Sequence, residues 1–292
     1  MKNTPLFTTA LAASLCLVGA AVQAQTVSLN FDTPGQYTGN FIAAANMTES
    51  PTAGVNGSGG VTDNLSADAN SIYDASSWDF SQVGDSITIS LMAQIANPIG
   101  GSGGTFQLGL GVNSSFVMAG STATSPAFGT FRLSRSSATA PSGFASFKIG
   151  PQFASGSALS SSSVQSAAFS LALGDWYQYN VTLVDTSSSS YSMTATLYDY
   201  GTTGLSPVTG TDLLAAYESA GLSMTNITGS AGAALVAATA ADPGWRVGTA
   251  TSGISALDNF SVVETVPEPS TFAMVGLGIS ALLGMSRFRR NK

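Results

Sequence analysis

Four windows of this sequence alternate between apolar residues and residues that are mostly polar or glycine. Apolar side chains occupy every second position in residues 87–95, 105–112, 177–183 and 191–197. Because successive side chains of a strand point to opposite faces, this pattern predicts strands with one face in a core. The chain is therefore expected to build its core by packing sheets face to face.

Weaker strand candidates are separated by turns rich in Gly, Ser, Asn and Pro, and lie at 26–31, 40–48, 128–135, 144–149, 168–173, 245–249 and 257–263. One helical pattern, over 212–220, gathers Leu213, Leu214 and Tyr217 on one side and predicts a short connecting helix. About eleven strands without βαβ alternation indicate an all-β fold, an antiparallel sandwich of the jelly-roll kind over residues 25–264.

Both ends of the chain differ from this body. Lys2, an apolar run over residues 6–22 and the small residues Val22 and Ala24 predict a secretory signal peptide, residues 1–24, cleaved after Ala24. A membrane anchor or a buried first helix is the alternative. At the other end, residues 271–285 are apolar and uncharged, although shorter than the ~20 residues of a comfortable membrane span.

Three basic residues, Arg287, Arg289 and Arg290, follow this second run. They are typical of a transmembrane helix whose C-terminus stays in the cytoplasm. We therefore expect signal and transmembrane helices at the two ends, and a body held outside the inner membrane.

The segment Val266-Pro267-Glu268-Pro269-Ser270, followed by an apolar helix and an Arg-rich end, resembles the PEP-CTERM sorting signal. The resemblance assigns residues 265–292 to that signal, with Pro267, Glu268 and Pro269 as the motif. It implies an exosortase-type processing enzyme as partner and export by a Gram-negative bacterium that makes exopolysaccharide. The alternative is a Pro-rich linker before an ordinary anchor.

Two blocks of the body resemble the concanavalin A-like lectin/glucanase superfamily, which includes laminin-G-like domains. They are "LALGDWYQYNVTLVDTSSSSYSMTATLYDYG" and "ALDNFSVVE". The resemblance implies a jelly roll with Trp176 in its core. It does not fix a function, since this fold carries lectins, glycosidases and adhesion modules alike.

Composition excludes several classes of function. Residues 25–264 hold four basic and fifteen acidic residues, a formal charge of −11, which disfavours nucleic acid as a partner. The chain has no histidine, and its one cysteine, Cys16, lies in the signal run. Ser-His-Asp catalysis, Cys/His zinc sites and disulfides in the body are therefore not expected.

Carboxylate catalysis is also disfavoured. A glycosidase needs two carboxylates flanking the bond, yet no two glutamates share an expected strand; they are Glu49, Glu218, Glu264 and Glu268. An aspartate-only site would have to come from the aperiodic segment 61–80, with Asp63, Asp68, Asp74 and Asp79. We expect no enzyme and no cofactor.

The same segment is a candidate site for a structural calcium ion. Asp63, Asp68 and Asp74 are the candidate ligands, because calcium prefers several hard oxygen ligands on loops. The spacing matches no calcium loop, and Asp-rich turns also occur simply because aspartate favours bends.

Aromatic residues supply the candidate binding surface. Trp78, Trp245, Tyr73, Tyr198 and Tyr200 are the candidates for stacking on sugar rings, with burial in the core as the alternative for each. Arg132 and Arg135 lie three residues apart on an expected strand. They should face opposite sides, so they do not form a paired anion clamp.

The sequence thus predicts an exported, non-catalytic sandwich that binds glycan or matrix. Exopolysaccharide or another glycan is the expected partner, and the inner membrane is engaged through the C-terminal helix. The expected location is an inner-membrane tether and then the envelope or extracellular matrix. The alternatives are a structural surface protein without ligand, or a weak glycan hydrolase or lyase.

Overall fold

A computed structural model describes residues 24–42, 46–63, 69–95, 105–112, 127–155, 158–161, 166–217, 224–227, 229–248 and 253–267. Residues 25–265 form one compact unit. The signal segment before Ala24, the motif residues Glu268 and Pro269 and the C-terminal apolar run lie outside the described residues. Within the described part, no helix has the length and apolar character needed to span a membrane.

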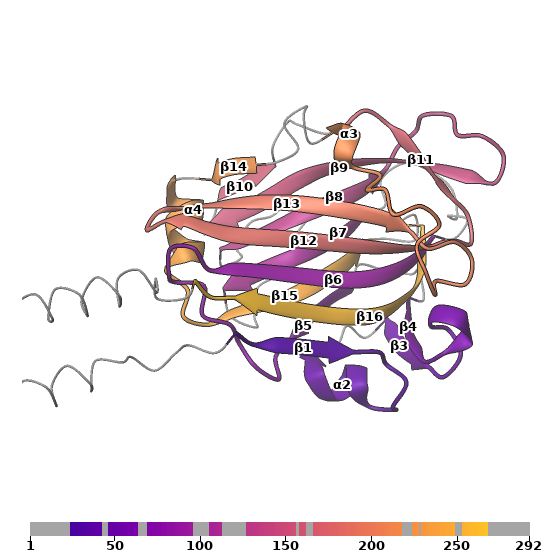
Figure 1. The fold of residues 1–292 in the computed structure, drawn as a ribbon, viewed down its shortest axis with the longest axis horizontal. Coiled ribbons are helices and arrows are strands. Elements are labelled where there is room, and N and C mark those ends of the chain that lie inside the picture. The colour runs from indigo at the N-terminus through magenta and orange to yellow at the C-terminus, as the bar shows by residue number, and fades with distance from the viewer. Residues whose placement is uncertain are drawn as a thin grey trace, which may run out of the picture. The chain divides into compact units, whose positions relative to one another are not determined.

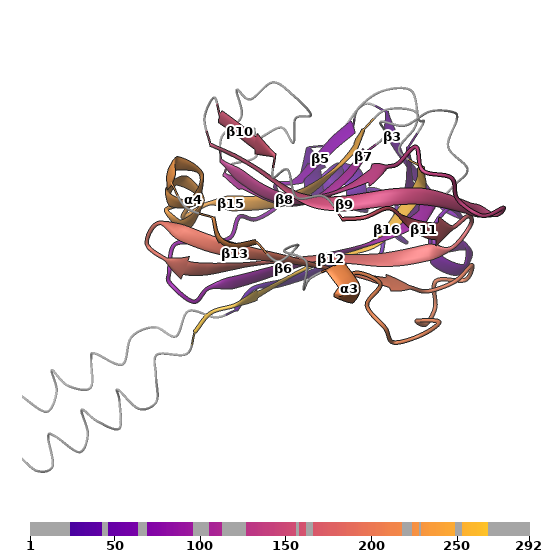
Figure 2. The same cartoon turned by 90° about the horizontal axis from the view of Figure 1, so that it is seen from above.

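The compact unit is a sandwich of two antiparallel sheets (Figures 1 and 2). Sheet 1 runs in the order β14-β13-β12-β6-β16-β4-β3, and β1 also pairs with β16. Its strands are β1 (Thr26–Leu29), β3 (Met47–Ser50), β4 (Gly60–Asp63), β6 (Ser86–Ile95), β12 (Trp176–Ser187), β13 (Ser190–Asp199), β14 (Met224–Ile227) and β16 (Ile254–Thr265).

Sheet 2 runs in the order β10-β9-β8-β7-β15-β5-β2, and β11 also pairs with β9. Its strands are β2 (Phe41–Ile42), β5 (Ala69–Tyr73), β7 (Thr105–Val112), β8 (Phe128–Arg135), β9 (Phe144–Ser155), β10 (Ala158–Ser161), β11 (Phe169–Ala172) and β15 (Ala241–Gly248). Figure 2 shows the two sheets as separate layers.

The all-β antiparallel class is confirmed, and the four alternating windows are strands β6, β7, β12 and β13. Their apolar positions face the space between the sheets. Outside these windows, Trp245 of β15 and Phe260 of β16 also meet across this space, with ring centroids 5.5 Å apart. Phe106 of β7 and Tyr179 of β12 make a similar contact at 5.7 Å. Burial of these alternate side chains fixes which face of each strand points inward.

Short helical segments decorate the sandwich: α2 (Gln36–Asn40), the 3-10 turn η1 (Val55–Gly57), α3 (Ala215–Tyr217) and α4 (Gly229–Val236). The predicted helix over 212–220 is reduced, within the described residues, to α3. Here Asp212 accepts hydrogen bonds at one oxygen from the backbone N–H groups of Leu197 and Leu214. The preceding segment is thus tied to strand β13 rather than continuing as helix.

The segment 61–80, which shows no period in the sequence, contains the end of β4 and all of β5. These strands belong to different sheets. The expectation of a turn-rich segment was therefore incomplete, because pairing with β16 and β15 makes strands of short stretches that lack a regular pattern of their own.

Candidate functional site

A ladder of paired residues crosses the outer face of sheet 1. Trp176 of β12 pairs with Gln94 of β6, which pairs with Ala256 of β16, and Ala256 pairs with Thr62 of β4. Their neighbours Tyr177 and Leu257 point into the main core. Because side chains alternate along a strand, the four ladder residues lie on the opposite face.

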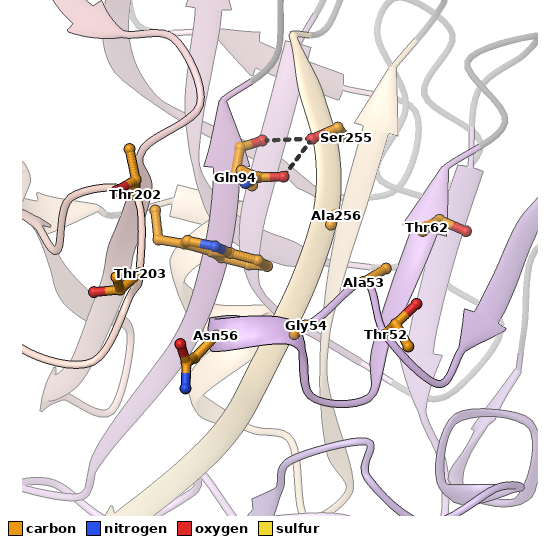
Figure 3. Close-up of a pocket in the computed structure, with 12 residues that line it drawn as sticks. Thr52, Ala53, Gly54, Asn56, Thr62, Gln94, Thr202, Thr203, Ser255 and Ala256 are labelled. Carbon is orange, nitrogen blue, oxygen red and sulfur yellow. Dashed lines mark hydrogen bonds between the residues drawn. The ribbon is translucent and has the colours of Figure 1, made fainter.

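This ladder is the floor of a pocket of about 520 Å³ (Figure 3). In the figure, Thr202 and Thr203 stand on one side and Thr52 and Ala53 on the other, with Gly54 and Asn56 along the lower edge. Its lining is Thr52, Ala53, Gly54, Asn56, Gly57, Thr62, Gln94, Trp176, Thr202, Thr203, Ser255 and Ala256. The volume falls in the range of small-molecule sites, roughly 300–1,000 Å³.

One wall of the pocket is held by a buried carboxylate. Asp258 is 1% exposed, and its Oδ2 atom accepts hydrogen bonds from the backbone N–H of Val55 (2.8 Å) and the hydroxyl of Ser58 (3.1 Å). It immediately precedes an irregularity in the β16–β6 pairing, at which Asn259 has a φ of 50°. Burial raises the pKa of Asp258, while the bonds from Val55, Asn259 and Ser58 act in the opposite direction.

The other wall is held to Trp176 itself. The backbone N–H of Trp176 donates to the carbonyl of Gly201 (2.8 Å), and that of Tyr200 donates to the carbonyl of Trp176 (2.9 Å). Gly204 then closes this loop with a φ of 71°, and a Cβ there would lie 3.0 Å from Cγ of Trp176. Only glycine fits, because both the backbone conformation and the close approach exclude a side chain.

Gln94 is fixed at the centre of the floor. Its Nε2 atom donates to the carbonyl of Gly174 (3.1 Å), and its Oε1 atom accepts from the hydroxyl of Ser255 (3.1 Å), as Figure 3 shows for the second bond. The amide is thereby held in one orientation on the pocket floor, where it is a fixed polar group beside the indole of Trp176.

The lining has hydroxyl, amide and backbone groups and no carboxylate. Such a surface donates and accepts hydrogen bonds without a charge, and it offers no acid and base pair to cleave a glycosidic bond. Two of the four glutamates are occupied structurally: Glu49 accepts from the backbone N–H groups of Gly35 and Tyr37, and Glu264 accepts from that of Gln25. Glu218 and Glu268 lie outside the described residues.

The prediction of stacking on sugar rings was wrong for three residues. Trp78 and Trp245 are fully buried and Tyr73 is 5% exposed, all within the core between the sheets. Trp245 packs against Phe41 and Phe260 at ring-centroid distances of 4.6 and 5.5 Å. A ring enclosed in this way has no face to offer a sugar.

Tyr198 and Tyr200 lie outside the core and are half-buried. Tyr198 pairs with Gln178 on the outer face of sheet 1, and the Tyr200 hydroxyl donates to Oε1 of Gln178 (2.9 Å). Tyr200 also packs against a small cluster of Val55, Met92, Trp176 and Ala256 beside the pocket. Neither tyrosine is among the lining residues, so both border the pocket.

Trp176 occupies an unexpected place. It is 2% exposed, in keeping with the expected burial, but it belongs to the small outer cluster rather than to the core between the sheets. The sequence did carry the signal that separates it from the core. Trp176 immediately precedes Tyr177, the first inward-facing residue of the alternating window, and its parity therefore places it on the outer face.

The calcium candidates are not brought together. Asp63 is a buried residue of β4 in sheet 1, Asp74 is exposed just after β5 in sheet 2, and Asp68 lies outside the described residues. In the described part of the chain, no three residues with metal-ligating side chains form a group that would hold a metal ion.

The comparisons with known proteins bear first on the C-terminus. Residues 265–290 match the family model of the PEP-CTERM protein-sorting motif. The chain carries a PEP-CTERM sorting signal. The match includes Pro267, Glu268 and Pro269, as expected from the sequence, and it marks the chain as an exported protein processed by an exosortase-type enzyme. Among curated protein sequences, none matches this chain.

Solved structures bear on the sandwich of residues 25–265. Lectin II from Ulex europaeus is similar with a TM-score of 0.51 at 14% identity, over 83% of this chain and 99% of the lectin. A lectin from Bauhinia forficata in complex with GalNAc has a TM-score of 0.44 at 11% identity, over 83% and 99%. An endo-1,3-beta-glucanase from Streptomyces sioyaensis has a TM-score of 0.42 at 12% identity, over 85% and 99%. The first likeness shows the lectin-type jelly-roll fold.

Proposed function

We propose that this protein is a non-catalytic glycan-binding domain exported to the cell envelope or extracellular matrix, and that the pocket over Gln94 is its binding site. The observation that carries the proposal is the uncharged lining, which presents hydroxyl, amide and backbone groups. Sugars present hydroxyls that exchange hydrogen bonds with such polar groups. The lectin-type fold and the sorting signal support the same assignment.

The exopolysaccharide of the producing cell is the proposed ligand, and the C-terminal segment is the proposed inner-membrane tether before processing. A neutral sugar suits the pocket because no charged side chain lines it. Hydrolysis is the weaker candidate: a glucanase shares the general architecture, but the lining of this pocket holds no carboxylate. If the protein were a structural surface protein without a ligand, the fixed amide of Gln94 would have no role beyond folding.

The test compares two glutamines on the same face of sheet 1. Gln94→Met removes the amide of the pocket floor, whereas Gln178→Met removes an amide that lies outside the lining and accepts a bond from Tyr200. Binding of the full-length chain to a panel of neutral polysaccharides should weaken at least tenfold in Gln94→Met and less than twofold in Gln178→Met. Equal binding by both variants and the unaltered protein would remove the pocket from consideration.

Catalysis is tested on the same panel. We expect no release of reducing ends on prolonged incubation with the unaltered protein. Release that disappears in Gln94→Met would instead favour the hydrolase alternative.

A further inference from the structure

The compact unit begins against its own last strand. β1 pairs with the end of β16, with Thr26 opposite Val263 (Figure 1). Gln25 extends this pairing by one residue, because the backbone N–H of Glu264 donates to the carbonyl of Gln25 (2.9 Å). The predicted signal cleavage after Ala24 would make Gln25 the first residue of the exported chain.

The other polar groups of Gln25 are bonded as well. Its backbone nitrogen donates to Oε2 of Glu264 (3.1 Å), and its side-chain Nε2 atom donates to the hydroxyl of Ser76 (2.6 Å). Ala24, the residue before it, is exposed. The backbone nitrogen at which cleavage would create an amino group is therefore already in contact with a carboxylate.

That carboxylate belongs to a buried side chain. Glu264 is 5% exposed, and it has the same parity on β16 as Val262, a residue of the core between the sheets. Its side chain therefore points inward. Glu264 pairs with Ile87 of β6, which is also a core residue. A charge in such a place is costly unless it is accompanied by an opposite charge or by hydrogen-bond donors.

The charges that act on Glu264 are negative. Burial is the largest cause that raises the pKa of Glu264, the bond from Gln25 opposes it, and repulsion from Asp85 and Asp79 adds to it. Asp85 is itself 2% exposed, and its carbonyl accepts from the backbone N–H of Asp185, which is 1% exposed. Glu264 thus lies in an acidic region of the sandwich, where a positive charge would be favourable.

The basic residues of the body lie on the other sheet. Sheet 2 carries all four of them, Arg132 and Arg135 on β8, Lys148 on β9 and Arg246 on β15. Arg135 is on the inward side of β8, with its guanidinium carbon 5.3 Å from the centre of the Phe147 ring, and Arg132 is on the outward side because three positions separate the two. A cation at Gln25 would instead belong to sheet 1, beside Glu264.

We propose that Glu264 is the binding site for the N-terminal ammonium group of the exported chain. Hydrolysis adds water across the peptide bond between Ala24 and Gln25, which leaves a carboxylate on Ala24 and an ammonium group on Gln25. A neutral N–H donor 3.1 Å from Oε2 of Glu264 is thereby replaced by a charged donor at the same atom. Because charge-assisted hydrogen bonds are the stronger ones, signal removal fastens β1 to β16 more firmly.

The inference rests on the predicted signal cleavage and involves no residue of the pocket over Gln94. It can therefore fail without affecting the proposed glycan binding, and the reverse also holds. The ion pair stabilises the strand that leads into the sorting motif, since Glu264 lies three residues before Pro267. Maturation of one end of the chain thus secures the fold next to the other end.

The test compares the cut and uncut forms of the full chain. Val22→Phe together with Ala24→Phe removes both small residues that signal cleavage requires, and keeps the chain uncut. Both forms are extracted in the same detergent, and mass spectrometry establishes the first residue of each. Gln25 is expected as the first residue of the cut chain, and any other residue there would overturn the proposal.

Glu264→Gln is then introduced into both forms. In the cut chain it should raise the equilibrium constant for urea unfolding about tenfold, because the ammonium group loses its charged partner. In the uncut chain it should change that constant less than twofold or lower it. There the side-chain amide still accepts the N–H bond, and the repulsion from Asp85 and Asp79 is relieved.

Glu49→Gln is the matched control. Glu49 also accepts backbone N–H bonds, from Gly35 and Tyr37, but these donors stay neutral on signal removal. Its substitution should therefore have the same effect in the cut and uncut chains. An effect of Glu264→Gln that is likewise equal in the two forms would overturn the proposal.

The pH dependence gives a second readout that needs no substitution at Glu264. The α-amino group of an unfolded chain loses its proton at about pH 8. The ion pair favours the charged form in the folded state, so the extra stability of the cut chain should be complete at pH 7 and decline as the pH rises above about 8. The uncut chain has a neutral amide at Gln25 and should lack this decline. Parallel pH profiles of the two forms would contradict the ion pair.

Discussion

Val55 and Asp258 lie 203 residues apart in sequence, and the backbone N–H of Val55 donates to Oδ2 of Asp258 over 2.8 Å. The bond joins the loop before β4 to the closing strand β16. Since Gly54 and Asn56 on either side of Val55 line the pocket, this one carboxylate sets the position of a wall of the candidate site.

Replacing this carboxylate should loosen the wall. Asp258→Asn retains the size of the side chain but exchanges one acceptor oxygen for a donor, and we expect unfolding free energy to fall by about 1–3 kcal/mol. Urea unfolding followed by tryptophan fluorescence measures the change. Asp79→Asn, at an exposed aspartate that accepts hydrogen bonds from Ser81, should change stability by about 0.5 kcal/mol or less. Equal effects of the two substitutions would contradict this role.

The loop on the other wall depends on Gly204. Gly204→Ala introduces a Cβ atom 2.9 Å from Cγ1 of Val55 and 3.0 Å from Cγ of Trp176, at a φ of 71°. We expect a loss of about 1–3 kcal/mol in unfolding free energy, together with weaker glycan binding. Gly210→Ala is the matched control, because nothing lies within 4 Å of a Cβ there. Thermal unfolding of both variants should separate them clearly.

Burial of Trp245 predicts an effect on stability rather than on binding. Trp245→Ala should lower the unfolding free energy by about 3–5 kcal/mol, since it removes the ring that packs on Phe41 and Phe260. Tyr198→Ala, at a half-buried position on the outer face, should lower it by about 1 kcal/mol or less. Urea titration checks both. A small loss at Trp245 would argue against the core position.

The pH dependence of stability follows from buried carboxyl groups. Burial, the largest cause in each case, raises the pKa of Asp85, Asp185 and Glu264, and repulsion from neighbouring aspartates adds to it. At pH values above the ordinary Asp and Glu pKa values of 3.8 and 4.5, the unfolded chain has released its carboxyl protons. The folded protein still holds the protons of these three groups there, because their pKa values are raised. In that window the folded state binds more protons, so stability is greatest below it and falls as pH rises.

We expect unfolding free energy, measured in urea from pH 3.5 to 7, to decrease with rising pH across this window. Asp185→Asn should reduce the size of the decrease, because a neutral amide releases no proton. A stability that instead increases steadily from pH 3.5 to 7 would show that other groups dominate.

The sorting signal predicts a defined processing defect. Pro267→Ala together with Pro269→Ala removes both prolines of the motif and the restriction that proline places on the backbone, so an exosortase-type enzyme should leave the tail attached. Mass spectrometry of the protein recovered from an exosortase-containing host should then show the longer chain. Pro207→Ala, at an exposed proline of the sandwich, should be processed normally. Normal processing of the double variant would exclude these prolines as determinants.

The sequence by itself determined the C-terminal sorting signal and the class of fold. The motif at Pro267 to Pro269 is a short linear sequence, so it can be recognised without knowledge of the fold. Strand alternation is local too, and the window at 191–197 was enough to predict most of β13 and its inward face. Even the separation of Arg132 from Arg135 by face followed from spacing alone.

Only the tertiary structure decided which outward residues meet. Trp176, Gln94 and Thr62 become neighbours through the register of β12, β6, β16 and β4, and Arg132 and Arg246 through their common partner Gln107. Register between strands far apart in the chain depends on how the whole core packs. For the same reason Trp78 and Trp245, for which the sequence left both sugar stacking and core burial open, proved to be core residues, because burial depends on how the sheets assemble.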